Sequence, residues 1–211
     1  MSIDRFTIIS FAALIVAVIL HEISHGVVAL WFGDDTARRA GRLTLNPIPH
    51  IDPFGSVVLP AMGALAGVPV LAWAKPVPVN PSRLRNPRRD MVVVALAGPA
   101  TNLTLMVASA LVARTLIARE SAPTVDALSL AAQVALVFAV VNLFLGLFNL
   151  LPIPPLDGSA LLERALPARH LETWYRFRPY GILVLFLLVF WTGAVGRLMD
   201  PFLDRLYDFV T

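Results

Sequence analysis

Long apolar runs alternate with short polar segments along the chain. Positions 6–33 are apolar except for His21, Glu22 and His25, and positions 91–113 carry no charge. Two further apolar runs occupy positions 127–150 and 179–196. A helix needs about 20 apolar residues to cross a bilayer core about 30 Å thick. The first three runs therefore predict transmembrane helices, and the shorter fourth predicts one because it contains the intensely apolar sequence ILVLFLLVFW.

Positions 53–74 are also uncharged and long enough to span, but prolines and glycines interrupt them. If this stretch spans and the N-terminus is inside, 10 Lys and Arg residues lie inside and 7 outside. If it dips in and returns, with the N-terminus outside, the division becomes 12 to 5. The positive-inside rule favours this re-entrant arrangement. Irregular backbone at membrane depth must be covered by protein or line a water-filled cavity, so a cavity is expected nearby.

Composition supports the bilayer as the solvent of this chain. Of the 211 residues, 57% are hydrophobic and only 15% are charged, and the mean hydropathy is +0.74. These values exclude a disordered chain and disfavour an ordinary soluble domain, which carries roughly 25% charged residues. We expect an all-α polytopic membrane protein with a single membrane-embedded domain over residues 1–211. The expected architecture is a bundle of four to six transmembrane helices, with a re-entrant Pro/Gly-rich β-hairpin or loop after the first span.

The distribution of charge and the absence of cysteine limit the partners and metal ligands that this sequence can have. The net charge of +3 arises from 16 Arg and one Lys against 14 acidic residues, and the basic residues are grouped at the ends of apolar runs. This pattern is typical of contact with a lipid bilayer and not of a nucleic-acid patch. The absence of cysteine excludes disulfides and Cys-ligated metal sites. His, Asp and Glu are the remaining strong metal ligands.

The sequence HEISH at positions 21–25 lies within the first predicted helix. Residues four apart share one face of a helix, so His21 and His25 can bind a single zinc ion while Glu22 lies beside them as a general base. The competing interpretation is a helix end whose polar residues contact lipid headgroups. Buried ionisable groups cost roughly 2.5–3.5 kcal/mol each, which favours the metal site.

A catalytic zinc site uses three protein ligands and keeps one position open. Asp157 follows a proline cluster at the end of the third apolar run and lies on the same side of the membrane as the histidines in the favoured topology. Its alternative role is the N-cap of a helix starting at Ser159. His50 and Asp52 are equally suited to a turn. The candidates for the third ligand are thus His50, Asp52 and Asp157, and less readily Glu163 and His170.

Several strings together resemble the site-2 protease family, the intramembrane zinc metalloproteases. They are HEISH, ALAGPATN at 95–102 and NLFLGLFNLLPIPPLDG at 142–158, with GRLTLNPIPHIDPFG and WAKPVPVNP between them. The match extends over positions 18–158, about two thirds of the chain. It is to a minimal form of the family, without the PDZ or CBS module of many relatives.

The resemblance implies that His21, His25 and Asp157 bind one Zn²⁺ per chain and that Glu22 is the general base. It also implies that Asn149 and Asn102 help to hold the substrate backbone. The implied reaction is hydrolysis, by a zinc-activated water, of peptide bonds in or near the transmembrane segments of protein substrates. The implied place is a prokaryotic inner (plasma) membrane, with the active site toward the cytoplasmic side. Substrate identity, the need for prior cleavage and oligomeric state stay open.

Other interpretations of these residues compete with that assignment. Asn102 and Asn149 could instead hydrogen-bond between helices, and close packing is the favoured role for Gly98. The alternation in positions 41–46 predicts a short strand whose edge pairs with an unwound substrate. The alternative functions are a catalytically inactive relative, or a metal or ion transporter that uses the same buried ligands.

Overall fold

Residues 4–58, 62, 74–120 and 124–211 are described by a computed structural model. These parts of the chain are helical, with no β-strand assigned in them. The elements are α1 (Arg5–Trp31), α2 (Thr36–Arg39), η1 (Ile48–His50), η2 (Pro53–Val58), η3 (Pro81–Arg83), α4 (Pro87–Ile117), η4 (Val125–Ala127), α5 (Leu130–Asn149), α6 (Ser159–Ala165), α7 (Ala168–Phe177), η5 (Arg178–Tyr180), α8 (Gly181–Phe186), η6 (Leu187–Trp191) and α9 (Ala194–Val210).

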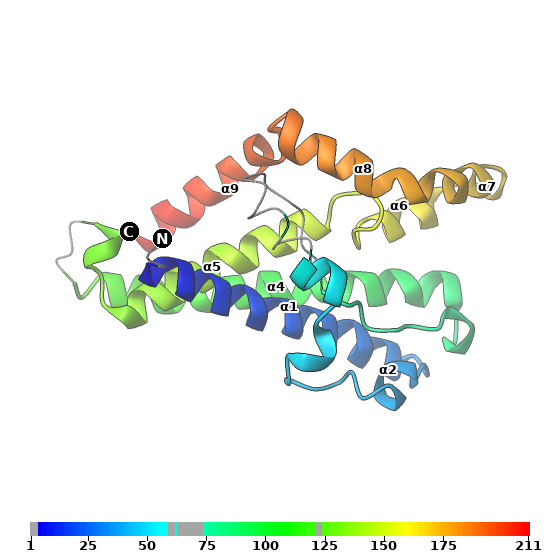
Figure 1. Ribbon diagram of the computed structural model, residues 1–211, viewed down its shortest axis with the longest axis horizontal. Coiled ribbons are helices and arrows are strands. Elements are labelled where there is room, and N and C mark those ends of the chain that lie inside the picture. Colours follow the sequence, from blue (N-terminus) through cyan, green and yellow to red (C-terminus); the bar gives the residue numbers. More distant parts are fainter. Residues whose placement is uncertain (1–3, 59–61, 63–73, 121–123) are drawn as a thin grey trace.

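Three long helices, α1, α4 and α5, lie side by side along the long axis of the molecule (Figure 1). Each is long and apolar enough to cross a membrane. They coincide with the spans predicted at 6–33, 91–113 and 127–150, with ends shifted by a few residues. Because α1 and α5 run opposite to α4, the C-terminal ends of α1 and α5 meet the N-terminal end of α4 (Figure 1).

Local side chains set where these helices begin and end. The carboxylate of Asp4 accepts a hydrogen bond from Thr7 N at the start of α1, and the hydroxyl of Ser129 accepts one from Ala132 N at the start of α5. Such caps satisfy amides that have no partner inside the helix. Just after α1, Gly33 has φ +103°, a conformation that glycine adopts without steric cost. The chain can therefore turn sharply there toward α2.

The predicted fourth span, 179–196, is interrupted. The helical run Ala168–Trp191 and helix α9 are bent by 66° relative to each other, and together they arch over α5 (Figure 1). The break lies at Gly193, which has φ +60°, and Thr192 Oγ1 accepts a hydrogen bond from Ala194 N where the helix restarts. The described residues thus give three spans, or four if the bent pair counts as one. The expectation of four to six is met at most at its lower limit.

The stretch 53–74 is described only for η2, for Met62 and for Ala74, so a hairpin within it lies outside the described residues. Its flanks nevertheless meet: Lys75 N donates to His50 O over 2.9 Å, and Arg42 Nη2 donates to Lys75 O over 2.5 Å. These hydrogen bonds join the segment before the stretch to the segment after it.

The short strand predicted at 41–46 is wrong, since these residues form turns and bends. Leu43 instead packs on α1, where a Cβ added to Gly26 would come 2.5 Å from Leu43 Cδ2. Burial of this leucine against the helix outweighed the alternating pattern.

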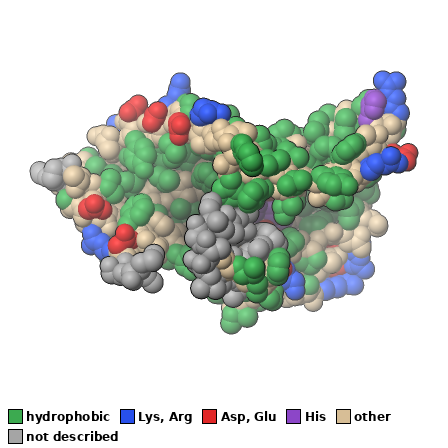
Figure 2. All heavy atoms as spheres, turned by 45° about the horizontal axis from the view of Figure 1, so that its top comes forward, with side chains coloured by type: hydrophobic (Ala, Val, Ile, Leu, Met, Phe, Trp, Pro, Cys, Tyr) green, Lys and Arg blue, Asp and Glu red, His purple; other side chains and the backbone are tan. Residues whose placement is uncertain are grey.

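Basic residues gather at one end of the bundle. Of the 17 Lys and Arg residues, 12 lie in segments 38–42, 75–89 and 164–178, at the end where α1 and α5 finish and α4 begins. Hydrophobic side chains cover much of the face shown in Figure 2, and most charged side chains lie toward its two ends. This is the arrangement expected of a membrane-spanning protein, which places its charges outside the hydrocarbon layer.

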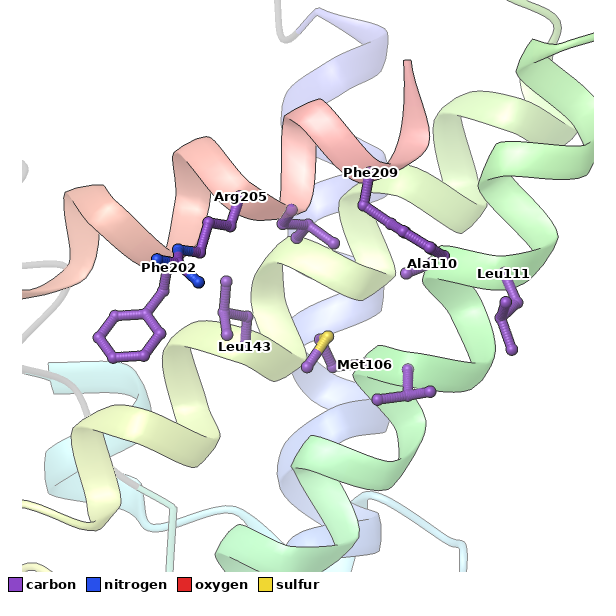
Figure 3. Close-up of a pocket in the computed structure, with 9 residues that line it drawn as sticks. Met106, Ala110, Leu111, Leu143, Phe202, Arg205 and Phe209 are labelled. Atoms are coloured by element: carbon purple, nitrogen blue, oxygen red, sulfur yellow. The ribbon is translucent and has the colours of Figure 1, made fainter.

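A pocket of about 380 Å³ lies between α4, α5 and α9, near the opposite end of the bundle (Figure 3). Its lining is apolar except for Arg205. It contains no group that could bind a metal or accept a proton at neutral pH. The chemistry suggested by the sequence is therefore located elsewhere.

Candidate metal centre

Three side chains from two distant parts of the sequence converge near the basic end of the bundle. His21 and His25 lie on α1, and Asp157 lies in the loop after α5. The two Nε2 atoms are 3.1 Å apart, and Asp157 Oδ2 lies 3.1 Å from His21 Nε2 and 3.4 Å from His25 Nε2. Zinc bonds of about 2.0–2.1 Å at tetrahedral angles separate the ligand atoms by about 3.3 Å. The triangle therefore has the size that a zinc ion requires.

The hydrogen bonds behind the imidazoles orient them for a metal. His21 Nδ1 lies 2.5 Å from Asn102 Oδ1, and His25 Nδ1 lies 2.7 Å from Val94 O. Both partners are acceptors, so each Nδ1 carries the hydrogen and each Nε2 of a neutral ring presents a lone pair. Asp157 Oδ2 is buried and receives no hydrogen bond from the residues that the structure describes. Lone pairs from three residues thus point at one place, an arrangement that a cation stabilises.

The loop 150–158 carries Asp157 to the histidines. Gly158 N donates to Asn149 O over 2.7 Å, which closes the loop on the end of α5. A Cβ at Gly158 would collide with the Leu150 carbonyl, so glycine is needed there. The alternative of Asp157 as a helix cap is not found, because α6 begins at Ser159 with Gly158 as N-cap and without a side-chain cap.

Gly98 on α4 makes room for the imidazoles. A Cβ built on it would lie 2.5 Å from His21 Nε2 and 2.6 Å from His25 Nε2. Real Cβ atoms do not approach so closely. The expected close-packing role of this glycine is confirmed, and the atoms it packs against are the two candidate ligand nitrogens.

Glu22 follows His21 on α1 and is half-buried. Its Oε2 accepts a hydrogen bond of 2.7 Å from Val77 N. Val77 stands between Pro76 and Pro78, which have no N–H group, so it is the only residue of this tripeptide that can donate. The segment that follows position 74 therefore holds the candidate general base.

The other candidate ligands have partners of their own. His50 Nε2 lies 3.0 Å from Thr44 O, and Asp52 Oδ1 accepts from the backbone of Phe54 and Gly55. Asp52 thus forms the turn considered as its alternative role. Glu163 accepts hydrogen bonds from Trp174 and Tyr175 in the next helix, and the imidazole of His170 lies beside Arg169 at the surface. In the described part of the chain, Asp157 alone joins the two histidines.

The two asparagines lie in different surroundings. Asn102 is fully buried behind His21, and this placement favours support of the imidazole over contact with a substrate. Asn149 is half-buried at the end of α5, and its Nδ2 donates to Leu145 O. Sequence reasoning missed a third asparagine, Asn142 on α5, whose Oδ1 accepts a hydrogen bond of 2.8 Å from Asn102 Nδ2. An amide side chain in the middle of an uncharged apolar run was the available signal.

Comparison with known proteins gives information that is independent of the site geometry. The model of peptidase family M50 matches residues 115–191, which include Asp157. A Bacillus subtilis (strain 168) protein named "Putative zinc metalloprotease YwhC" is 38% identical over 199 residues, which cover 92% of this chain and 85% of the relative. The chain belongs to peptidase family M50.

Two further relatives extend this finding. The Rip2 protein of Mycolicibacterium smegmatis is 32% identical, covering 96% of this chain and 74% of the relative. That of Mycobacterium tuberculosis (strain H37Rv) is 37% identical, covering 83% and 65% respectively. Both carry the same zinc metalloprotease designation. No solved structure gives a significant match.

Membership of M50 agrees with the donor set of His21, His25 and Asp157. The chain is a metalloprotease of the site-2 protease family, its cofactor is zinc, and three of its described helices are long and apolar enough to cross a membrane. The His21, His25 and Asp157 group fits that cofactor in ligand type, number and spacing.

Proposed function

We propose that this M50 chain is an intramembrane endopeptidase that cuts peptide bonds in or near the transmembrane segments of protein substrates. The observation that carries the proposal is the zinc-sized triangle formed by His21 and His25 on the apolar helix α1 with Asp157 in the loop after α5, next to Glu22. Three ligands leave one tetrahedral position for water or substrate, as catalytic zinc sites do.

In this proposal each residue has a defined task. His21, His25 and Asp157 hold the zinc, which when bound acts as a Lewis acid that polarises the scissile carbonyl and acidifies water. Glu22 takes the proton of the attacking water at its carboxylate and returns it to the leaving amine. Val77 N–H holds one carboxylate oxygen of Glu22 over 2.7 Å, which leaves the other oxygen for the proton.

Asn149 is proposed to bind the substrate backbone. It lies at the end of α5, directly before the loop that carries Asp157, and its side chain is half-buried. A peptide bond within a helix is shielded by its own hydrogen bonds, so the substrate must be locally extended and held before attack. A half-buried amide beside the loop of Asp157 can donate to and accept from such an extended segment.

Zinc content and cleavage of a panel of single-span substrates test the proposal in purified full-length protein. Wild type should hold about one zinc and cut at least one substrate. Glu22→Gln should keep the zinc but lose about 10²–10⁴-fold in kcat, the usual contribution of general base catalysis. Asp157→Ala should lose most of the metal. Glu163→Gln is the matched control, because Glu163 pairs with Trp174 and Tyr175 outside the triangle. Undiminished cleavage by Glu22→Gln would overturn the assignment.

We further propose that the basic end of the bundle is cytoplasmic, in a prokaryotic inner membrane. The support is the gathering of 12 of the 17 Lys and Arg residues there, as the positive-inside rule requires. The chain has no native cysteine, so single cysteines at Arg38, Arg85 and Arg119 can be labelled selectively in intact cells. Arg38→Cys and Arg85→Cys should be protected while Arg119→Cys reacts. Labelling of Arg38→Cys and Arg85→Cys from opposite sides would contradict this topology.

A further inference from the structure

A chain of buried amides runs from the candidate metal centre into the bundle. His21 on α1, Asn102 on α4 and Asn142 on α5 are linked in that order by hydrogen bonds of 2.5 and 2.8 Å. Both asparagines have no exposed surface. Each of the three long helices contributes one of these residues, so the hydrogen bonds connect α4 and α5 to the imidazole of His21.

The hydrogen bonds along this chain have a direction. A zinc ligand at Nε2 requires the hydrogen of His21 on Nδ1, so Asn102 must present its carbonyl oxygen to the ring. The amide nitrogen of Asn102 then faces α5 and needs an acceptor there, which Asn142 Oδ1 supplies. The nitrogen of Asn142 in turn donates to Phe138 O over 2.9 Å. Only in this orientation do the oxygen and the nitrogen of both asparagine amides have hydrogen-bond partners.

Reversal of the Asn102 amide would have a chemical consequence. Its nitrogen would then donate to His21 Nδ1, which places the ring hydrogen on Nε2 and removes the lone pair that the metal needs. The other acceptor near Asn102 Nδ2 is Ala17 O, at 3.4 Å, too long for a strong bond. The contact with Asn142 is therefore the main force that keeps the amide in the orientation suited to metal binding.

We propose that Asn142 is a positioning residue of the metal centre, which fixes the amide of Asn102 and through it the tautomer of His21. This inference rests on the proposed role of His21 as a ligand. It extends the site to α5, which supplies no ligand from its own helical residues.

The test compares zinc affinity, measured by chelator competition, in purified full-length variants. Asn142→Leu removes the acceptor while it keeps the number and branching of the side-chain heavy atoms, and it should weaken zinc binding about tenfold, as loss of outer-shell partners does. Gln133→Leu is the matched control. Gln133 is also buried on α5 and donates to Val125 O and Asp126 O near the opposite end of the helix. Its loss should leave the zinc Kd within about twofold.

A double-mutant cycle separates positioning from general damage to the fold. If Asn142 acts through Asn102, Asn142→Leu should cost no further zinc affinity in an Asn102→Leu background. A further tenfold loss there, or equal zinc affinities of Asn142→Leu and Gln133→Leu, would overturn the inference. Wild type that binds zinc while His21→Ala does not would leave the proposed ligand set standing in either case.

Two additional measurements keep the test decisive. Asn142→Asp retains an acceptor oxygen in place of Oδ1 and should bind zinc within about threefold of wild type. Weak binding by folded Asn142→Asp would count against the proposal, even if Asn142→Leu failed to fold. The absorption spectrum of Co²⁺ in the same site should change in Asn142→Leu and not in Gln133→Leu, because it responds to the ligand geometry.

Discussion

The two ends of the α4–α5 interface differ in residue type: one is polar and the other is apolar. Toward the basic end, Gly98 and Asn102 lie against the candidate ligands of α1, and Asn142 accepts a hydrogen bond from Asn102. Toward the other end, the same helices meet α9 through a buried cluster of small and branched apolar residues: Ala110, Ala113, Leu128, Ala132, Ala135, Leu136, Ala139, Leu143, Leu206 and Val210.

This difference shows how one helix pair can serve two purposes. Small residues let membrane helices approach closely and fix their register by packing alone. The polar end then receives a spacing that is already set, which amide hydrogen bonds and metal ligands require. If this division is real, substitutions at one end should change metal binding and those at the other end should change stability.

The largest effect on the metal is expected from Gly98→Ala. Its methyl group would lie 2.5 Å from His21 Nε2, so zinc affinity should fall by at least about 100-fold, beyond the loss of an outer-shell contact. The metal-free protein should keep its thermal stability, because alanine favours a helix over glycine by up to about 1 kcal/mol. Gly196→Ala on α9, where a Cβ would meet nothing within 4 Å, is the control. Normal zinc affinity in Gly98→Ala would contradict the site geometry.

The opposite pattern is expected from Ala113→Leu. Ala113 has no exposed surface and belongs to the apolar cluster at the other end. Overpacking such a position costs about 1–3 kcal/mol, so the metal-free protein should unfold at a lower temperature. Its zinc Kd, measured where the protein is folded, should match that of wild type. A zinc affinity that fell together with stability would show that the two ends are not independent.

A smaller effect, on catalysis alone, is expected from Val77→Pro. The substitution removes the N–H that donates to Glu22 Oε2, and hydrogen bonds to charged groups are worth about 1.5–3 kcal/mol. We expect kcat to fall about tenfold, with zinc content unchanged. Val77→Ala keeps the N–H while it loses the buried side chain, so it serves as control. Equal activities of the two variants would show that the hydrogen bond does not matter.

The sequence predicted the features that depend on neighbouring residues, and it did not predict those that depend on contacts between distant segments. The convergence of His21 and His25 needed only the helical period, and the three long spans needed only hydropathy. The place of Asp157 depended on a loop of prolines, and its assignment gained from the family resemblance. The partners of Asn102 could not be predicted, because they depend on the mutual rotation of three helices, which no single segment encodes. The break at Gly193 was missed because hydropathy does not respond to a single left-handed residue.

The smallest expected effect concerns the turn that connects the metal-binding helix to the segment holding Glu22. Asp34 follows α1, is fully buried, and accepts hydrogen bonds from Asn80 N and from Thr36 N and Oγ1. Burial alone would raise the pKa of Asp34. The hydrogen bonds from Thr36 and Asn80, with the charge of Arg83, outweigh it and hold the pKa below the ordinary value of 3.8.

Because the folded-state pKa of Asp34 is depressed, its carboxylate stabilises the fold at pH values above about 4. The contribution is lost as the pH falls through the lowered pKa. Asp34→Asn should therefore lower the free energy of unfolding by about 1–2 kcal/mol at pH 7, and its difference from wild type should shrink below pH 4. Thermal unfolding of both proteins at pH 7, 4 and 3 measures this.

The neighbouring Asp35 provides the matched control for Asp34. It pairs with Arg39 and Arg83, whose side chains are solvent-exposed, and exposed ion pairs contribute little to stability. Asp35→Asn should thus cost less than Asp34→Asn at pH 7. A pH-independent effect of Asp34→Asn would show that the turn is held by packing and not by its buried carboxylate. In that case packing would stabilise the turn after α1, as it stabilises the apolar end of the bundle.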